Sequence, residues 1–223
     1  MLLDSIQNRF EVYRTLKDSL QRRAYYQQID SLSQLAAKYF IPNEYDKLMS
    51  SIGAEGTNAY TSNDVTCYVE DIPANELENW AKIESDRFQN MVIRGFHTEL
   101  EAVYEEYNIS LGNDNRKLFA ALNAMLFPGH PYGTQTTIGT QEHLKNPSIV
   151  NIKNYFSRYY VPNNTAICMA GDFDPDKAIA IIDKYFGTWK PNPNLSQPEY
   201  APIPERTAPA DTTVVGRSLS AYT

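Results

Sequence analysis

The chain has 223 residues, of which 42% are hydrophobic and 21% are charged, as is ordinary for a globular protein. Its formal net charge of −7, without any basic cluster, argues against nucleic-acid binding. No apolar run approaches the roughly 20 residues that a membrane-spanning helix needs, so we expect no membrane span, and no signal-peptide pattern follows Met1.

The chain opens on apolar residues at helical spacing, which predict a helical hairpin over the first 42 residues. Its two helices are expected at about 3–16 and 20–39. A short helix is then predicted over 43–52, and Gly53 is a typical residue to end it.

The period then changes to two, which is typical of β-strands. Strands are predicted over 57–62 and 66–72, with a hairpin turn at 63–64. A buried strand is predicted over 165–171, and 212–216 is expected to begin another. Because three full strands make a thin sheet for so much helix, we expect part of a domain to lie outside this chain.

Helical periodicity returns after the hairpin, and a proline-rich stretch from Pro191 to Pro209 predicts an extended linker. Asp174 before Pro175 is a favourable N-cap. The further helices are predicted at about 77–88, 94–111, 116–127, 140–145, 148–159 and 175–186.

Glu99 and Glu106 lie seven residues apart, close to two helical turns, so both carboxylates are expected on one face of their helix. Ala102 and Val103 share that face and are apolar. Carboxylates in an apolar stripe are costly unless a cation or hydrogen-bond donors meet them. A bound metal is one interpretation, and surface acids matched by Lys or Arg are the alternative.

The other side chains that could bind a metal give no complete site. The sequence contains no HxxEH, HExxH or CxxC motif. His130, in a Pro- and Gly-rich turn, is expected to make a structural hydrogen bond, and His143 is expected to be solvated. Cys67 and Cys168 are expected to be buried free thiols, with one disulfide as the alternative.

Several short motifs follow one another in a fixed order over about 43–186. They are Gly56-Thr57-Asn58-Ala59-Tyr60-Thr61, Thr66-Cys67-Tyr68, Glu99-x6-Glu106, Phe127-Pro128-x-His130-Pro131-Tyr132-Gly133, Tyr159-Tyr160-x-Pro162-x-Asn164 and Gly171-Asp172-Phe173. Together they resemble the pitrilysin/insulinase (M16) zinc metallopeptidases. The resemblance implies an α+β fold of the LuxS/MPP type, with helices packed on an antiparallel sheet and incomplete at the N-terminus.

The resemblance also implies roles for the two acids. In that family an HxxEH helix supplies two zinc-binding histidines and the glutamate that activates water, and a later glutamate completes the site. Glu106 matches this third zinc ligand, and Glu99 matches an acid of the catalytic site that orients it. The HxxEH segment is expected upstream of this chain. We therefore expect this chain alone to hold no catalytic zinc and to cleave nothing.

The segment Asn58, Ala59 and Thr61 resembles the edge strand on which the family lays an extended peptide substrate, by addition of a β-strand. An ordinary hairpin strand is the alternative for these residues. The resemblance implies a peptide partner and places the protein in the periplasm or cell envelope. Self-association is also expected, because truncation would expose a sheet edge and an apolar helix face.

The predicted organisation has three parts: a helical hairpin insertion over 1–42, a partial M16-like domain over 43–190, and a linker with the start of a further strand over 191–223. The function implied is that of a piece of a zinc endopeptidase. A non-catalytic M16-like subunit that binds peptides or scaffolds a partner is the alternative.

Overall fold

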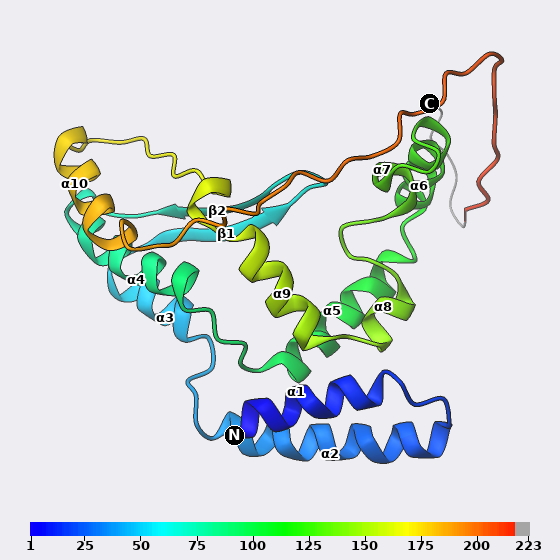
Figure 1. Ribbon diagram of the computed structural model, residues 1–223, viewed down its shortest axis with the longest axis horizontal. Coiled ribbons are helices and arrows are strands. Elements are labelled where there is room, and N and C mark those ends of the chain that lie inside the picture. The colour runs from blue at the N-terminus through cyan, green and yellow to red at the C-terminus, as the bar shows by residue number, and fades with distance from the viewer. Residues whose placement is uncertain (217–223) are drawn as a thin grey trace. The chain divides into compact units, whose positions relative to one another are not determined.

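The computed structural model describes residues 1–216 and shows two compact units (Figure 1). The first unit comprises residues 1–60, 66–95 and 148–196, and the second comprises 61–65, 96–147 and the described residues from 197 on. Each unit is therefore assembled from segments that are distant in the sequence.

The first unit holds most of the helices and the hairpin, and the second unit holds four helices. The elements of the first unit are α1 (Leu2–Tyr13), α2 (Ser19–Ala37), α3 (Glu44–Ser51), β1 (Glu55–Thr61), β2 (Thr66–Asp71), α4 (Leu77–Gln89), α9 (Ile149–Tyr159) and α10 (Pro175–Phe186). Those of the second are α5 (Phe96–Ser110), α6 (Asp114–Leu126), α7 (Pro131–Thr134) and α8 (Gln141–Lys145). The predicted helices are confirmed, and α7 is an additional short one.

The predicted helical hairpin is confirmed by α1 and α2, which lie side by side at the start of the chain (Figure 1). Phe10 of α1 and Ile29 of α2 are fully buried, and Ile149 of α9, against which α1 also packs, is 4% exposed. The Asp18 carboxylate begins α2 by accepting the backbone N–H of Gln21 at 2.8 Å. The hairpin is thus held by its own core and by α9.

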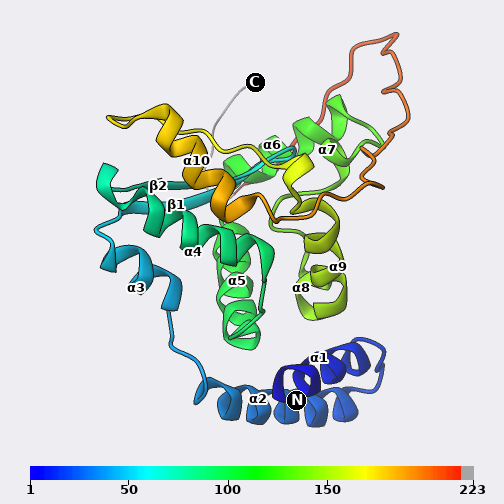
Figure 2. The same ribbon diagram turned by 60° about the vertical axis from the view of Figure 1, so that its left-hand side comes forward.

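The two strands form a two-stranded antiparallel sheet, and helices α3, α4 and α10 supply the core next to it (Figure 2). Buried side chains of this core come from all three helices: Met49, Leu77, Trp80, Ala81 and Ala178. The face of β2 that carries Tyr68 and Glu70 is turned toward these helices, because the Trp80 indole N–H donates to Glu70 and Phe88 packs edge-on against Tyr68. The predicted α+β class is confirmed.

A charged cluster is buried between β2 and the helices. Arg87 donates to the carboxylate of Glu84 at 3.1 Å and lies 4.0 Å from Glu70, and its guanidinium stacks over the ring of Tyr45 at 4.0 Å. The Tyr45 hydroxyl donates to Glu70 at 2.8 Å. Burial raises the pKa of Glu84, which is only 3% exposed, although Arg87 opposes the shift.

Two predicted strands are wrong. Residues 165–170 are without a strand assignment, and so are the described residues of the 212–216 segment. Ile167 remains 38% exposed, and Cys168 is an exposed rather than a buried thiol, while Cys67 is half-buried. A strand exists only where a neighbour pairs with it, and the described residues place no strand alongside 165–170. Both cysteines are free thiols.

The second unit has little apolar core of its own. In α5, α6, α7 and α8 the only fully buried side chain is that of His97, which is polar. Helix α8 packs against α5, where Gln141 donates to the Tyr104 hydroxyl at 2.9 Å. Among the described residues, no helix is both long enough and apolar enough to cross a membrane.

Candidate functional site

The two acids singled out by the sequence lie on α5, about 10.5 Å apart along its axis. Both Glu99 and Glu106 are exposed, and so is Ala102 between them on the same face. The interpretation that the two acids lie within a buried apolar stripe is therefore wrong for this chain. The helical spacing is confirmed, but no described element covers the face that the two acids share with Ala102 and the half-buried Val103.

The described residues contain no group of three His, Cys, Asp or Glu side chains placed to hold a metal ion. His97 lies near the acids in sequence but forms an i, i+4 contact with Glu101, at 3.7 Å from Nε2 to the carboxylate. A catalytic zinc site needs three protein ligands. The described residues of this chain therefore do not make a zinc site by themselves, and Glu106 could contribute one ligand at most.

Strand β1 carries the three residues predicted to bind a peptide, and all seven of its residues are exposed. The Ser62 N–H donates to the Val65 carbonyl at 2.8 Å across the turn, and this bond sets the register of the antiparallel pair. Along a strand, the N–H and C=O groups of successive residues point to opposite edges. In this register those of Ala59 and Thr61 point away from β2, to the outer edge. In the described residues no strand pairs with this edge.

Asn58 covers part of the same edge, because its side-chain oxygen accepts the N–H of Ala59 at 2.8 Å. An unpaired edge exposes hydrogen-bonding groups that attract other strands, and a local acceptor blunts this tendency. The amide of Asn58 is therefore placed to compete with an incoming peptide for one backbone donor. The structure brings Asn58, Ala59 and Thr61 together on one strand.

The loop after α6 contacts the turn between β1 and β2. The hydroxyl of Tyr132 donates to the Asp64 carboxylate at 2.5 Å. His130 precedes α7, and its Nδ1 accepts the backbone N–H of Tyr132 at 3.2 Å, which confirms the structural hydrogen bond predicted for it. The sequence motif singled out this loop but not its partner, for which the only signal was an aspartate in a hairpin turn.

The loop is also built on close backbone packing. A Cβ atom on Gly133 would lie 2.3 Å from the carbonyl oxygen of Phe127 and 2.8 Å from that of Asn123, so a side chain cannot be accommodated there. Glycine therefore lets the loop fold directly onto the end of α6.

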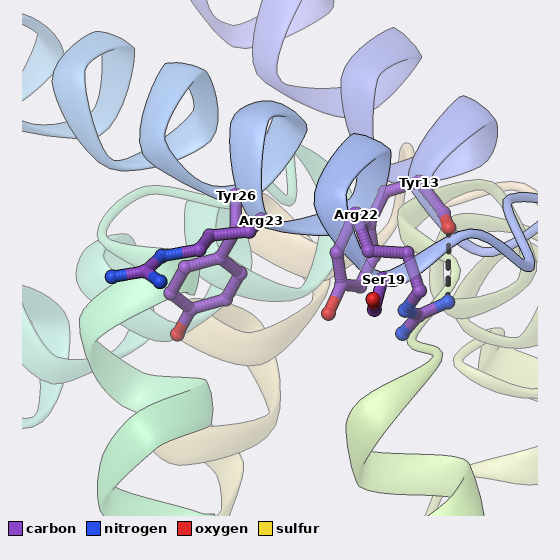
Figure 3. Close-up of a pocket in the computed structure, with 5 residues that line it drawn as sticks. All are labelled: Tyr13, Ser19, Arg22, Arg23 and Tyr26. Carbon is purple, nitrogen blue, oxygen red and sulfur yellow. Dashed lines mark hydrogen bonds between the residues drawn. The ribbon is translucent and has the colours of Figure 1, made fainter.

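A shallow cavity of about 370 Å³ lies where α1 meets α2 and is lined by Tyr13, Ser19, Arg22, Arg23 and Tyr26 (Figure 3). Two arginines in a cavity are typical of an anion-binding site. Arg22, however, donates to the carbonyl oxygens of Tyr13 and Leu16 at 3.1 and 3.2 Å. These are backbone groups at the C-terminal end of α1, which a cation satisfies favourably. Arg22 thus has a structural role at this helix end.

Comparison with known proteins shows similarity to peptidases over much of the chain. Residues 149–218 match the family model described as "Peptidase M16 inactive domain". An uncharacterized zinc protease of Mycobacterium leprae is 26% identical over 142 residues, and the zinc protease PqqE of Helicobacter pylori is 24% identical over 181 residues. The matches cover 63% and 77% of this chain. Over these stretches the chain is similar to M16 zinc proteases.

The fold of the chain is also similar to that of a solved protease structure. The crystal structure of the first half of the periplasmic protease PqqL from Escherichia coli superimposes with a TM-score of 0.63 and 21% sequence identity, covering 72% of this chain and 36% of that one. The chain spans 32% and 40% of the lengths of the two relatives from M. leprae and H. pylori. The family resemblance inferred from the motifs is confirmed.

Proposed function

We propose that this chain is part of an M16-type zinc endopeptidase, to which it contributes a zinc ligand and the strand that receives the peptide. Glu106 is the carboxylate ligand, and Glu99 is the catalytic-site acid that orients the ligand set. The relatives from M. leprae and H. pylori are named zinc proteases, which supports zinc as the metal of the intact protein. The first half of PqqL is a periplasmic protein, and we infer the same compartment here.

The observation that carries the proposal is the open edge of β1. Ala59 and Thr61 direct backbone groups outward from a strand whose seven residues are all exposed. An extended peptide can add to such an edge through main-chain hydrogen bonds, so that its sequence matters less than its conformation. The substrate class that this geometry supports is an unfolded peptide segment.

Peptide addition is tested with Ala59→Pro and the matched control Ala59→Val. Proline removes the outward N–H but no donor that faces β2, whereas valine keeps the donor and suits a strand. We expect the proline variant to bind a labelled, unstructured peptide at least tenfold more weakly in fluorescence polarisation, and the valine variant to bind like the wild type. Equal binding by both variants would exclude addition at this edge.

The metal role is tested after an HxxEH-bearing segment has been joined upstream of the chain. We expect this chimera to retain zinc on dialysis and to cleave a quenched peptide. Glu106→Gln should lose both properties, while Glu105→Gln, one position round the helix and also exposed, should keep them. If the two variants retain equal amounts of zinc, Glu106 is not a ligand.

A non-catalytic peptide-binding subunit is the second candidate function. It is favoured by the family model itself, which describes an inactive domain over residues 149–218. That match includes neither Glu99 and Glu106 nor β1. A chimera that binds peptide at the β1 edge but neither retains zinc nor cleaves would support this second candidate.

A further inference from the structure

We propose that Tyr132 and Asp64 are positioning residues for the peptide-binding strand, with His130 holding Tyr132 in place. We call these three residues the clamp, because Tyr132, supported by His130, holds Asp64 in the turn between β1 and β2. All of them lie in the second unit, together with the turn itself. The consequence for peptide binding rests on the proposed function, whereas the clamp rests on the contacts alone.

The clamp begins at the turn that ends β1. The Ser62 hydroxyl accepts the N–H groups of Asp64 and Val65, both at 3.3 Å, and the Ser62 N–H donates to Val65. Asp64 is thereby fixed with its carboxylate toward Tyr132, whose hydroxyl donates to it at 2.5 Å. This carboxylate raises the pKa of Tyr132, which keeps the phenol protonated as the donor.

His130 fixes the backbone and the ring of Tyr132. Its Nδ1 accepts the Tyr132 N–H, and the two rings meet edge to face with centroids 4.5 Å apart. An imidazole nitrogen accepts a hydrogen bond only when it carries no proton. The neutral form of His130, with its proton on Nε2, is therefore the form that this arrangement requires.

The charge on His130 decides whether the acceptor exists. The groups that face its ring are the aromatic side chains of Phe127, Tyr132 and Tyr200, with centroids at 6.3, 4.5 and 4.7 Å. Of these, the two phenols can titrate, and the Asp64 carboxylate is reached through the Tyr132 hydroxyl. A proton on Nδ1 would place its N–H against the backbone N–H of Tyr132, and the hydrogen bond that holds Tyr132 would be lost.

The clamp matters to β1 because Thr61 adjoins the held turn. A strand whose end is fixed has less conformational freedom to lose when a peptide adds to its edge, and such preorganisation increases affinity. Because Gly133 lets the loop pack directly on the backbone at the end of α6, the clamp has a firm base. Loss of the Tyr132 hydroxyl should therefore loosen the turn and weaken peptide binding together.

The clamp is tested by hydrogen exchange at the amides of Ser62, Asp64 and Val65. We expect Tyr132→Phe to speed their exchange at least fivefold at pH 8. Tyr200→Phe is the matched control, since it removes a hydroxyl but keeps the ring that stacks on His130. If Tyr132→Phe and Tyr200→Phe exchange alike, no clamp exists.

His130 is tested with His130→Asn, because asparagine is a good N-cap acceptor that does not titrate. At pH 8, exchange at the turn should stay near the wild-type rate in His130→Asn and rise at least threefold in His130→Ala, which removes the acceptor. Equal exchange in the two variants would overturn the part assigned to His130.

The positioning role is tested by peptide binding in the same polarisation assay. Tyr132→Phe should weaken binding threefold to tenfold at pH 8, and Tyr200→Phe should not. Equal affinity in Tyr132→Phe and wild type would overturn the positioning role even where exchange supports the clamp. If the wild type binds no peptide, the proposed function and the positioning role fail together, while the exchange experiment decides the clamp by itself.

Discussion

At the scale of single residues, Glu84 shows how burial and charge compete in the core. Its carboxylate is almost fully buried and shares one guanidinium, that of Arg87, with Glu70. Burial of the Glu84 carboxylate raises its pKa, and the nearby Glu70 carboxylate adds to the shift, whereas the half-buried Arg87 opposes it. A carboxyl with a raised pKa binds its proton more tightly in the folded state than in the unfolded state. The stability contributed by Glu84 is therefore largest at low pH and is lost as pH rises through the folded pKa.

We predict that Glu84→Gln becomes more stable relative to the wild type as pH rises from 5 to 8. Glutamine can still accept from Arg87 but carries no charge to desolvate. The difference in unfolding free energy can change by at most about 1.4 kcal/mol per pH unit for one proton. Urea unfolding at several pH values measures it. Glu78→Gln, an exposed acid on the same helix, should show no such change over this range, because Lys184 lowers the pKa of Glu78 and its carboxyl is ionised in both the folded and the unfolded state above pH 5.

For single residues, the sequence correctly predicted the helix face on which a side chain lies, but it did not predict whether that face is buried. The seven-residue spacing places Glu99 and Glu106 on one face of α5 because helical geometry is local. Their exposure depends on what covers that face, and neither spacing nor side-chain type contains this information. His130 was predictable because a histidine between glycine and proline can cap the next turn through its own backbone neighbours.

At the scale of elements, the side chain of Glu11 connects α1 to the start of α9. The Glu11 carboxylate of α1 accepts the Ser148 hydroxyl at 2.8 Å and the Val150 N–H at 3.3 Å. Ser148 in turn accepts the Asn151 N–H and begins α9. A carboxylate at a helix N-terminus is favourable because it meets unsatisfied N–H groups and the positive end of the helix dipole.

We predict that Glu11→Ala lowers the free energy of unfolding by about 1–2 kcal/mol, since it leaves Ser148 and an N-terminal N–H of α9 without their acceptor. Thermal unfolding followed by circular dichroism measures the loss. Asn8→Ala replaces an exposed residue of the same helix and serves as the control. Because alanine has the highest helix propensity, a loss in Asn8→Ala as large as that in Glu11→Ala would contradict a specific role of the Glu11 carboxylate.

Elements were predictable where their signals are local. Asp174 and Pro175 mark the start of α10, and the Asp174 side chain accepts the N–H of Asp176 as predicted. Gly53 ends α3 at φ +77°, a conformation that favours glycine. The strand predicted over 165–171 failed because apolar, β-branched composition shows suitability for a sheet but not the presence of a pairing partner.

At the scale of the whole molecule, the chain leaves apolar surface open on the second unit. Ile109 is 78% exposed, Phe119 56% and Leu126 49%. Apolar side chains concentrated on helices that bury none of their own are typical of surfaces that another body covers. The edge of β1 also exposes hydrogen-bonding groups, which favour association with another chain.

We predict that the chain self-associates as its concentration rises, because association would cover these side chains. Light scattering should show an apparent mass that increases with concentration. Ile109→Lys should shift the increase to a concentration at least several-fold higher, whereas Thr98→Lys, which adds the same charge at an exposed polar position of α5, should not. A constant monomer mass over the whole accessible range would contradict the prediction.

The division of the chain could not be predicted from sequence boundaries. The sequence suggests consecutive parts that end at residues 42, 190 and 223, and these boundaries stay a prediction. Contacts instead group 1–60 with 66–95 and 148–196. Changes of composition along a chain locate linkers, but they give no information about which distant segments pack together.

The relatives of this protein can be divided by whether they have glycine or another residue at the position equivalent to Gly133. Its Cα lies so near two backbone carbonyl groups that even a methyl group would collide with them. A relative with any other residue at the equivalent place must take a different path after the helix and cannot present a tyrosine to the hairpin turn in the same way. Such proteins would have to fix the proposed peptide-binding strand by other means.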